Sequence, residues 1–111
     1  MNVDIEQRCA VTLVKPSGAI NGDDADELKS IMSDIIKANM GRVVIDAGYI
    51  PSVDSRALEI LVDLSRQLAR SGKALKLCSV NETLKQVIEL TGLSSEFEQF
   101  HDSNSAIRSF L

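Results

Sequence analysis

Few residues in this sequence have side chains and neighbours that could support chemistry. The pair Asp54-Ser55 lies in a predicted loop and leads directly into an amphipathic segment. A serine in that place could act as a nucleophile beside a histidine, or either side chain could cap the helix by accepting hydrogen bonds from its first N–H groups. The single histidine, His101, follows far along the chain in a polar stretch, and no Gly-x-Ser-x-Gly sequence is present. We therefore expect a surface histidine and no hydrolytic site.

A phospho-accepting aspartate is a second chemical possibility. Asp46 ends a predicted buried strand, and Asp23 and Asp24 follow an earlier one, in a pattern loosely similar to the acidic pocket of a receiver domain. Two features oppose this interpretation. The chain begins with a predicted hairpin instead of a strand-helix unit, and Lys76 lies within a strand instead of after it.

The remaining chemical signals predict neither a metal nor a cofactor. Cys9 and Cys78 are far apart and have no Cys-x-x-Cys spacing, so we expect two reduced, semi-buried thiols. No Walker-type loop and no Gly-x-Gly-x-x-Gly sequence is present, so a dedicated phosphate or dinucleotide site is not expected. The sequence favours a protein that is not an enzyme.

Composition and length restrict the class of protein further. The chain has 111 residues, 44% of them apolar and 25% charged, which suits one globular domain over residues 1–111. The net charge is −4, the twelve basic residues are scattered, and there is little aromatic material for base stacking. Direct nucleic-acid binding is therefore not expected. No apolar run is long enough to cross a membrane, and we expect a cytoplasmic protein.

Hydrophobic periodicity predicts an α/β fold in the order β-β-α-β-α-β-α-β-α. Strands are predicted at residues 3–8, 10–16, 42–47, 73–80 and 96–102, and helices at residues 22–41, 53–72, 81–93 and 103–111. The first two strands form an antiparallel hairpin, and the later strand-helix-strand units make the rest of the sheet parallel. The run at 42–47 is apolar almost throughout, so it should be a central strand covered on both faces.

The two longest predicted helices have recognisable ends and faces. Asp23 or Asp24 is expected to cap the helix at 22–41, and Gly41 lies where that helix should end. The apolar face of the helix at 53–72 is predicted to include Leu58, Leu61, Val62, Leu68 and Ala69.

The chain resembles the STAS domain of bacterial anti-sigma factor antagonists over essentially all of its length. The resemblance lies in the order of elements and in three stretches, "VVIDAGYIPSVDSRALEIL", "GAINGDDADEL" and "LKLCSVNETLKQVIELTGL". In that family the serine directly after the aspartate is reversibly phosphorylated, which implies Ser55 here. The fold that the resemblance implies is a STAS-like single domain with a mixed, mainly parallel sheet and about four helices.

Two departures from the family pattern affect this site. The family commonly has Asp-Ser-Ser-Gly-Leu, and this chain has Arg56 and Ala57 at the third and fourth places while keeping Leu58. Asn21 stands where the family often has an acid, so it keeps hydrogen-bonding ability but lacks the charge. Arg56 is expected to be a solvated first-turn arginine, or else to offset the phosphate or contact a partner.

The resemblance implies a partner-switching function. Unphosphorylated, the protein would bind an anti-sigma factor that is also a serine kinase of the histidine-kinase-like ATPase type, and a metal-dependent serine phosphatase would reset it. The residues implied to bind the partner are Asp54, Ser55, Arg56, Leu58, Asn21 and Asp23. The alternative is a STAS scaffold or ligand-sensing module in a larger complex, with Ser55 serving only as a helix cap.

Overall fold

Five strands and four α-helices follow one another in the predicted order, and the computed structural model describes all of residues 1–111. The strands are β1 (Asn2–Arg8), β2 (Val11–Ser17), β3 (Val43–Asp46), β4 (Leu75–Cys78) and β5 (Phe97–Phe100). The helices are α1 (Gly22–Ala38), α2 (Ser55–Ala69), α3 (Glu82–Leu90) and α4 (Ser103–Arg108), and a short 3₁₀ turn, Ser94–Glu96, precedes β5. None of these helices is both long enough and apolar enough to span a lipid bilayer.

The strands form one sheet whose spatial order follows the chain, β1-β2-β3-β4-β5. β1 and β2 pair antiparallel, and the pairs from β2 to β5 are parallel, as predicted. Cys9 and Ala10 turn the hairpin with φ angles of 51° and 64°, in the left-handed region that a two-residue hairpin matched to the strand twist requires. In this five-strand order β3 is the central strand, as predicted.

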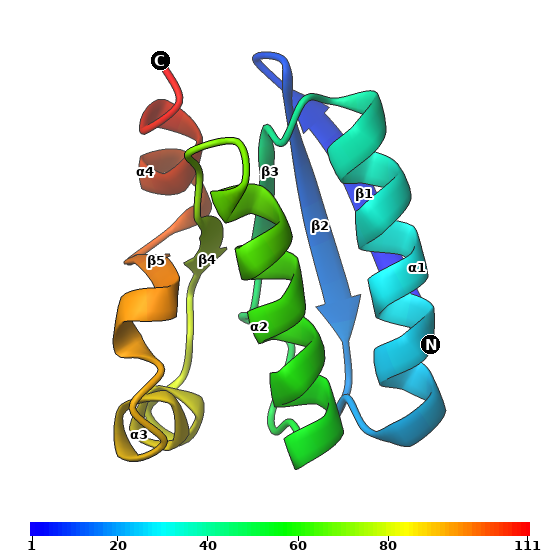
Figure 1. Ribbon diagram of the computed structural model, residues 1–111, viewed down its shortest axis with the longest axis vertical. Coiled ribbons are helices and arrows are strands. Elements are labelled where there is room, and N and C mark those ends of the chain that lie inside the picture. Colours follow the sequence, from blue (N-terminus) through cyan, green and yellow to red (C-terminus); the bar gives the residue numbers. More distant parts are fainter.

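Different helices cover the two faces of the sheet. Val43 and Ile45 of β3 belong to the larger core under α1, α2 and α3, whereas Val44 belongs to a smaller core under α4. Successive residues of a strand point to opposite faces, so this one strand supplies both cores and reads as continuously apolar. Figure 1 shows α1 and α2 side by side against the sheet.

The predicted cap of α1 is wrong. Asn21 occupies the N-cap position without a side-chain cap hydrogen bond, and Asp23 and Asp24 lie inside the first turn. Their charges still favour the helix there, because the N-terminal end of the helix dipole is positive. At the other end, the helix stops at Ala38, three residues before the predicted end at Gly41. Met40 and Gly41, with φ angles of 55° and 80°, belong to the turn that follows.

The buried face of α2 differs in part from the prediction. Ala69 is exposed, whereas Ala57 and Ser65, which were not predicted, are buried. The Ser65 hydroxyl donates a hydrogen bond to the carbonyl of Glu96 and accepts one from the N–H of Leu75 at 3.3 Å. A polar side chain is tolerated here because both of its hydrogen-bonding roles are satisfied.

The two cysteines are free and lie in different environments, so the expectation of two semi-buried thiols is corrected. Cys9 is exposed in the β1–β2 turn, and Cys78 is fully buried at the end of β4. Burial raises the pKa of the Cys78 thiol to about 11, and the nearby charge of Asp46 adds to the shift.

We expect thiol titration without reductant to separate the two cysteines. The native protein should show one rapidly reacting group, Cys9, because the Cys78 thiol is both buried and protonated at neutral pH. Denaturation should expose the second. The variant Cys9→Ser is the control: it should lose the rapid phase and still titrate as one thiol when denatured. A denatured parent that titrates near zero, with no other oxidation product, would contradict the free state of both thiols.

Candidate functional site

The loop before α2 lies beside the loop before α1, and backbone hydrogen bonds join them. The N–H of Ile20 donates to the carbonyl of Ser52, and the N–H of Asp54 donates to the carbonyl of Ile20, both at 3.1 Å. These bonds form a short parallel bridge between Ile20 and Val53. β2 and β3 are parallel neighbours, so their C-terminal ends meet at the same edge of the sheet. The bridge then fixes the starts of α1 and α2 relative to each other.

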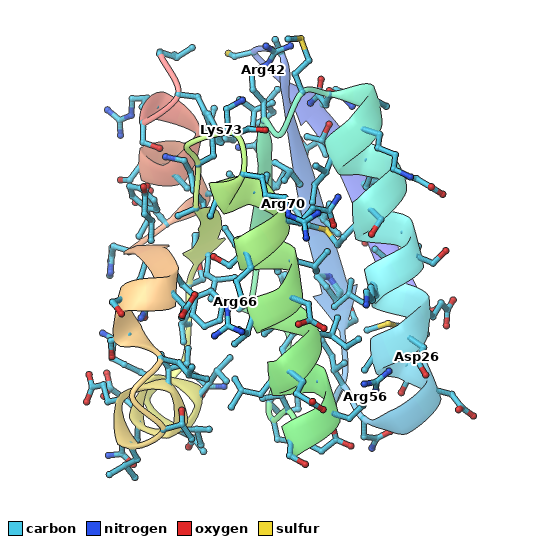
Figure 2. All side chains as sticks on the ribbon, in the orientation of Figure 1. Asp26, Arg42, Arg56, Arg66, Arg70 and Lys73 are labelled. Carbon is cyan, nitrogen blue, oxygen red and sulfur yellow. The ribbon has the colours of Figure 1, made fainter.

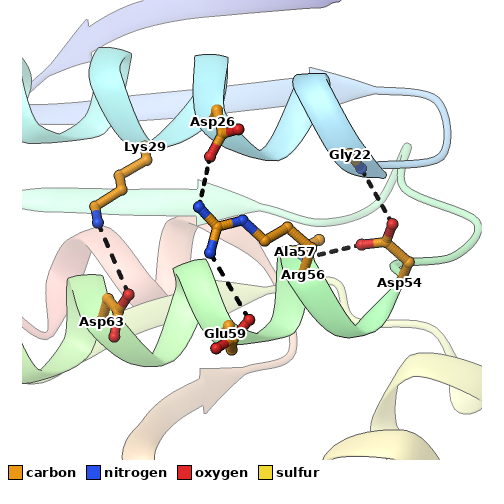
Figure 3. A network of polar contacts seen from close by, with 8 residues as sticks. All are labelled: Gly22, Asp26, Lys29, Asp54, Arg56, Ala57, Glu59 and Asp63. Atoms are coloured by element: carbon orange, nitrogen blue, oxygen red, sulfur yellow. Dashed lines mark hydrogen bonds and ion pairs between the residues drawn. The ribbon is translucent and has the colours of Figure 1, made fainter.

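One carboxylate serves the N-terminal ends of both helices. Oδ1 of Asp54 accepts a hydrogen bond from the N–H of Ala57 at 2.8 Å, and Oδ2 accepts one from the N–H of Gly22 at 3.1 Å (Figure 3). The first N–H groups of a helix have no acceptor within the helix, and they lie at the positive end of its dipole. These hydrogen bonds, the one from Ala57 most of all, lower the pKa of the Asp54 carboxyl group.

Ser55 is the first residue of α2, and it is exposed. The sequence left open whether Asp54 or Ser55 caps this helix, and the structure assigns the cap to Asp54. The Ser55 hydroxyl is therefore not needed for capping. It lies at the surface beside the positive end of the α2 dipole, where an added anion would favour the helix.

Arg56 reaches across to α1, which corrects the expectation of a merely solvated arginine. Its Nη2 donates to Oδ1 of Asp26 at 2.9 Å, and its Nη1 lies 3.8 Å from Oε2 of Glu59 (Figure 3). The hydrogen bond to Asp26, supported by the charge of Glu59, raises the pKa of Arg56. The side chain is 49% exposed, so these ion pairs add little stability. Their effect is to hold the guanidinium toward α1.

The other residues implied to bind a partner differ in exposure. Asn21 and Asp23 are exposed at the start of α1, next to the Asp54 carboxylate. Leu58 is only 8% exposed and packs in the larger core. Its accessible edge lines a shallow cavity of about 360 Å³ that Ser55 also lines. The structure thus brings five of the six predicted residues together at one end of the molecule, while Leu58 contributes mainly to the core.

The alternative chemical sites do not assemble. His101 follows β5 and lines another small cavity, with Ser79, that does not include Ser55. The Asp46 carboxylate accepts a hydrogen bond at 2.9 Å from an N–H two residues later in its own loop. The sheet order also differs from the 2-1-3-4-5 order of receiver-type folds. Neither the hydrolytic nor the receiver interpretation is supported.

Two features near the site were not predicted. Tyr49 is 63% exposed in the loop between β3 and α2, where an aromatic side chain could anchor a partner. Asn81 caps α3 as its sequence position suggests, but its Nδ2 also donates to the carbonyl of Ile50 at 3.0 Å. The only sequence signal for the exposed tyrosine was its position between the loop-forming residues Gly48 and Pro51. No local sequence pattern indicated the hydrogen bond from Asn81 to Ile50.

The sheet with its antiparallel first strand, helices on both faces and an Asp-Ser pair at the start of α2 defines the class of small α/β domains predicted above. Residues 2–106 match the family profile of the STAS domain. This chain therefore belongs to the STAS domain family.

Relatives and solved structures agree with this assignment. BtrV of Bordetella bronchiseptica, a protein named as an anti-sigma factor antagonist, is 25% identical over 93 residues, which are 84% of this chain and 80% of that protein. The crystal structure of TM1081 from Thermotoga maritima matches with a TM-score of 0.87 at 19% identity, covering 96% of this chain and 92% of that chain. The phosphorylated Bacillus cell fate determinant SpoIIAA matches with a TM-score of 0.71 at 13% identity, covering 97% and 99%. These structural likenesses show the fold.

We expect Asp54 and Ser55 to differ sharply in their effect on stability. Asp54→Ala removes an acceptor from two helix ends and should lower the urea midpoint clearly. Ser55→Ala removes no cap and should stay within about 0.5 kcal/mol of the parent. Equal losses in the two variants at pH 7 would contradict the assignment of the cap to Asp54.

The effect of Asp54 should also depend on pH. Because the pKa of its carboxyl group is lowered in the folded protein, the ionised group stabilises the fold above the unfolded-state pKa. That contribution is lost as the pH falls through the lowered folded-state value. The midpoint difference between parent and Asp54→Asn should therefore be constant above about pH 5 and shrink below about pH 4. A difference that grows on acidification would contradict this sign.

Proposed function

We propose that this protein is a partner-switching regulator controlled by phosphorylation of Ser55. Unphosphorylated, it would bind a serine kinase that also acts as an anti-sigma factor, or a related regulator, and make that protein release its other client. The observation that carries the proposal is the exposed Ser55 hydroxyl at the first position of α2, beside a cap that Asp54 already supplies. A serine that has no capping role at the positive end of a helix is well placed to carry a phosphate.

The charges around Ser55 support release after phosphorylation. A phosphate adds about −1.5 to −2 charges at neutral pH, here beside the ionised Asp54. Arg56 is the adjacent cation, and Asp26 and Glu59 already hold it. Much of the new charge would therefore stay uncompensated. A partner surface matched to a neutral hydroxyl would have to bury an unpaired dianion, at a cost on the order of several kcal/mol.

The relatives support the same scheme. BtrV is named as an anti-sigma factor antagonist. SpoIIAA has been solved in unphosphorylated and phosphorylated forms, and this chain matches them with TM-scores of 0.75 and 0.71. Similarity to both forms agrees with a modification that leaves the fold intact and alters only docking.

In this scheme the protein is not itself an enzyme. ATP and Mg²⁺ would belong to the kinase, of the histidine-kinase-like ATPase type, and a metal-dependent serine phosphatase would remove the phosphate in the cytoplasm. The scaffold alternative, in which Ser55 is only a helix cap, loses its main support because Asp54 provides that cap.

Ser55 should be the main phosphoacceptor for the cognate kinase. Its closest rival is Ser52, which is exposed on the same loop but whose backbone is held in the bridge to Ile20. With purified kinase and radiolabelled ATP, Ser55→Ala should lose nearly all label, while Ser52→Ala should be labelled at the parent rate. The opposite result would move the site to Ser52.

Substitutions at Ser55 should separate binding from stability. Ser55→Ala and Ser55→Asp should both melt near the parent, because Asp54 keeps the cap in each. The variant Ser55→Ala should still bind the kinase and behave as constitutively active. The variant Ser55→Asp should bind about tenfold more weakly if one charge at the interface costs on the order of 1.4 kcal/mol of binding free energy. The decisive comparison is calorimetry with protein phosphorylated enzymatically at Ser55. Binding as tight as that of the unmodified protein would refute the switch.

A further inference from the structure

The end of the molecule opposite Ser55 gathers basic side chains. Lys37 lies in the last turn of α1, Arg42 just before β3, Arg70 at the C-cap of α2, and Lys73 in the following turn. Figure 2 shows Arg42, Arg70 and Lys73 toward one end of the molecule and Arg56 toward the other. None of the four takes part in the eight ion pairs of the structure. In a chain of net charge −4, unpaired positive charge is concentrated here.

The fold accounts for part of this concentration. Lys73 Nζ donates to the carbonyl of Met40, and Arg42 Nε donates to the carbonyl of Ala10 at 3.0 Å. Cations near the ends of α1 and α2 also complement the negative ends of the helix dipoles. That electrostatic benefit explains why the exposed residues Lys37 and Arg70 carry positive charge. It does not require a hollow, partly apolar surface between them.

Such a surface is present. A groove of about 480 Å³ lies at the ends of α1 and α2, and no acidic side chain lines it. We call it the basic groove, and its lining includes the cations Lys37, Arg70 and Lys73 and the apolar side chains of Ile36, Met40 and Leu68.

Met40 is the most exposed apolar residue of the basic groove. It is 71% exposed. Its φ of 55° is the left-handed conformation that ends α1, where the N–H of Gly41 donates to the carbonyl of Ile36 at 3.0 Å, and glycine or asparagine is more common than methionine at such a position. Gly41 holds the turn against α2, because a Cβ there would lie 3.0 Å from Cδ2 of Leu68. A flexible methionine that is exposed beside cations suits a contact surface.

We propose that the basic groove binds an acidic segment of a protein partner. Carboxylates of the segment would meet Lys37, Arg70 and Lys73, and one of its apolar side chains would rest on Met40 and Leu68. A nucleic acid fits less well, because none of the chain's four aromatic residues lines the groove to stack on a base. The groove and Ser55 lie at opposite ends of a molecule 31 Å long, so this surface is additional to the proposed switch and can be occupied together with it.

The test uses a fluorescein-labelled peptide of about twelve residues in which a leucine is flanked by glutamates, followed by fluorescence anisotropy. We expect saturable, salt-sensitive binding that the double variant Lys37→Gln/Arg70→Gln weakens about tenfold. The matched control is Lys85→Gln/Arg108→Gln, which removes the same charge from two other cations that form no ion pair. This control should change binding less than about twofold, because screening limits the reach of distant charges.

A second variant tests the apolar contact. Asparagine tolerates the left-handed backbone, so Met40→Asn should melt at or above the parent temperature while it weakens peptide binding at least about threefold. Unchanged binding in this variant would remove Met40 from the site.

Several outcomes would overturn the proposal. One is the absence of saturable peptide binding up to about 1 mM peptide at low salt. Another is an equal loss of peptide affinity in the two double variants. A third is groove-dependent binding of a DNA duplex or of phosphatidylserine vesicles that is tighter than binding of the peptide. Self-association that Lys37→Gln/Arg70→Gln abolishes would assign the groove to a second copy of the chain instead. Labelling of Ser55 by the kinase should be unaffected in the groove variants, so failure of this proposal and failure of the switch are distinguishable.

Discussion

The candidate site depends on the carboxylate of Asp54. α1 and α2 begin side by side, so the positive ends of two helix dipoles lie close together with N–H groups that have no acceptor in their own helices. One anion between them accepts from Gly22 and from Ala57, residues of different helices. Its charge offsets the repulsion between the two dipoles. Because Asp54 fills this role, the adjacent Ser55 hydroxyl is left without a structural task.

The same arrangement joins the residues on both sides of Ser55 to α1. Asp54, directly before Ser55, accepts a hydrogen bond from Gly22 at the start of α1. Arg56, directly after it, pairs with Asp26 of α1. On the other side, Asn81 ties the cap of α3 to the loop between β3 and α2. Because its backbone is held by these hydrogen bonds, this turn can rearrange little when a phosphate is added. The modification would therefore act through charge presented to a partner, and not through rearrangement of this domain.

The sequence predicted the order of elements well and the contacts between them poorly. Periodicity reports which face of an element is apolar, so the central position of β3 and the helical segments were recoverable from local patterns. The acceptor for Gly22 was not, because it comes from Asp54, 32 positions along the chain. The pairing of Arg56 with Asp26 was missed for the same reason. Likewise, basic residues scattered in the sequence converge on the basic groove only after α1 and α2 are packed.

The parallel packing of α1 and α2 also gives the two ends of the molecule opposite electrostatic character. Helix N-termini favour the aspartates near Ser55, and helix C-termini favour the cations around the basic groove. A phosphate on Ser55 would increase this separation of charge, which strengthens the field that orients charged partners. Yet the Debye length is only about 8 Å at physiological salt, far shorter than the 31 Å molecule. The phosphate should therefore have little direct electrostatic effect at the groove. Any coupling between the two surfaces would have to pass through movement of α1 or α2, which the bridge, the shared carboxylate and the close contact of Gly41 with Leu68 all oppose.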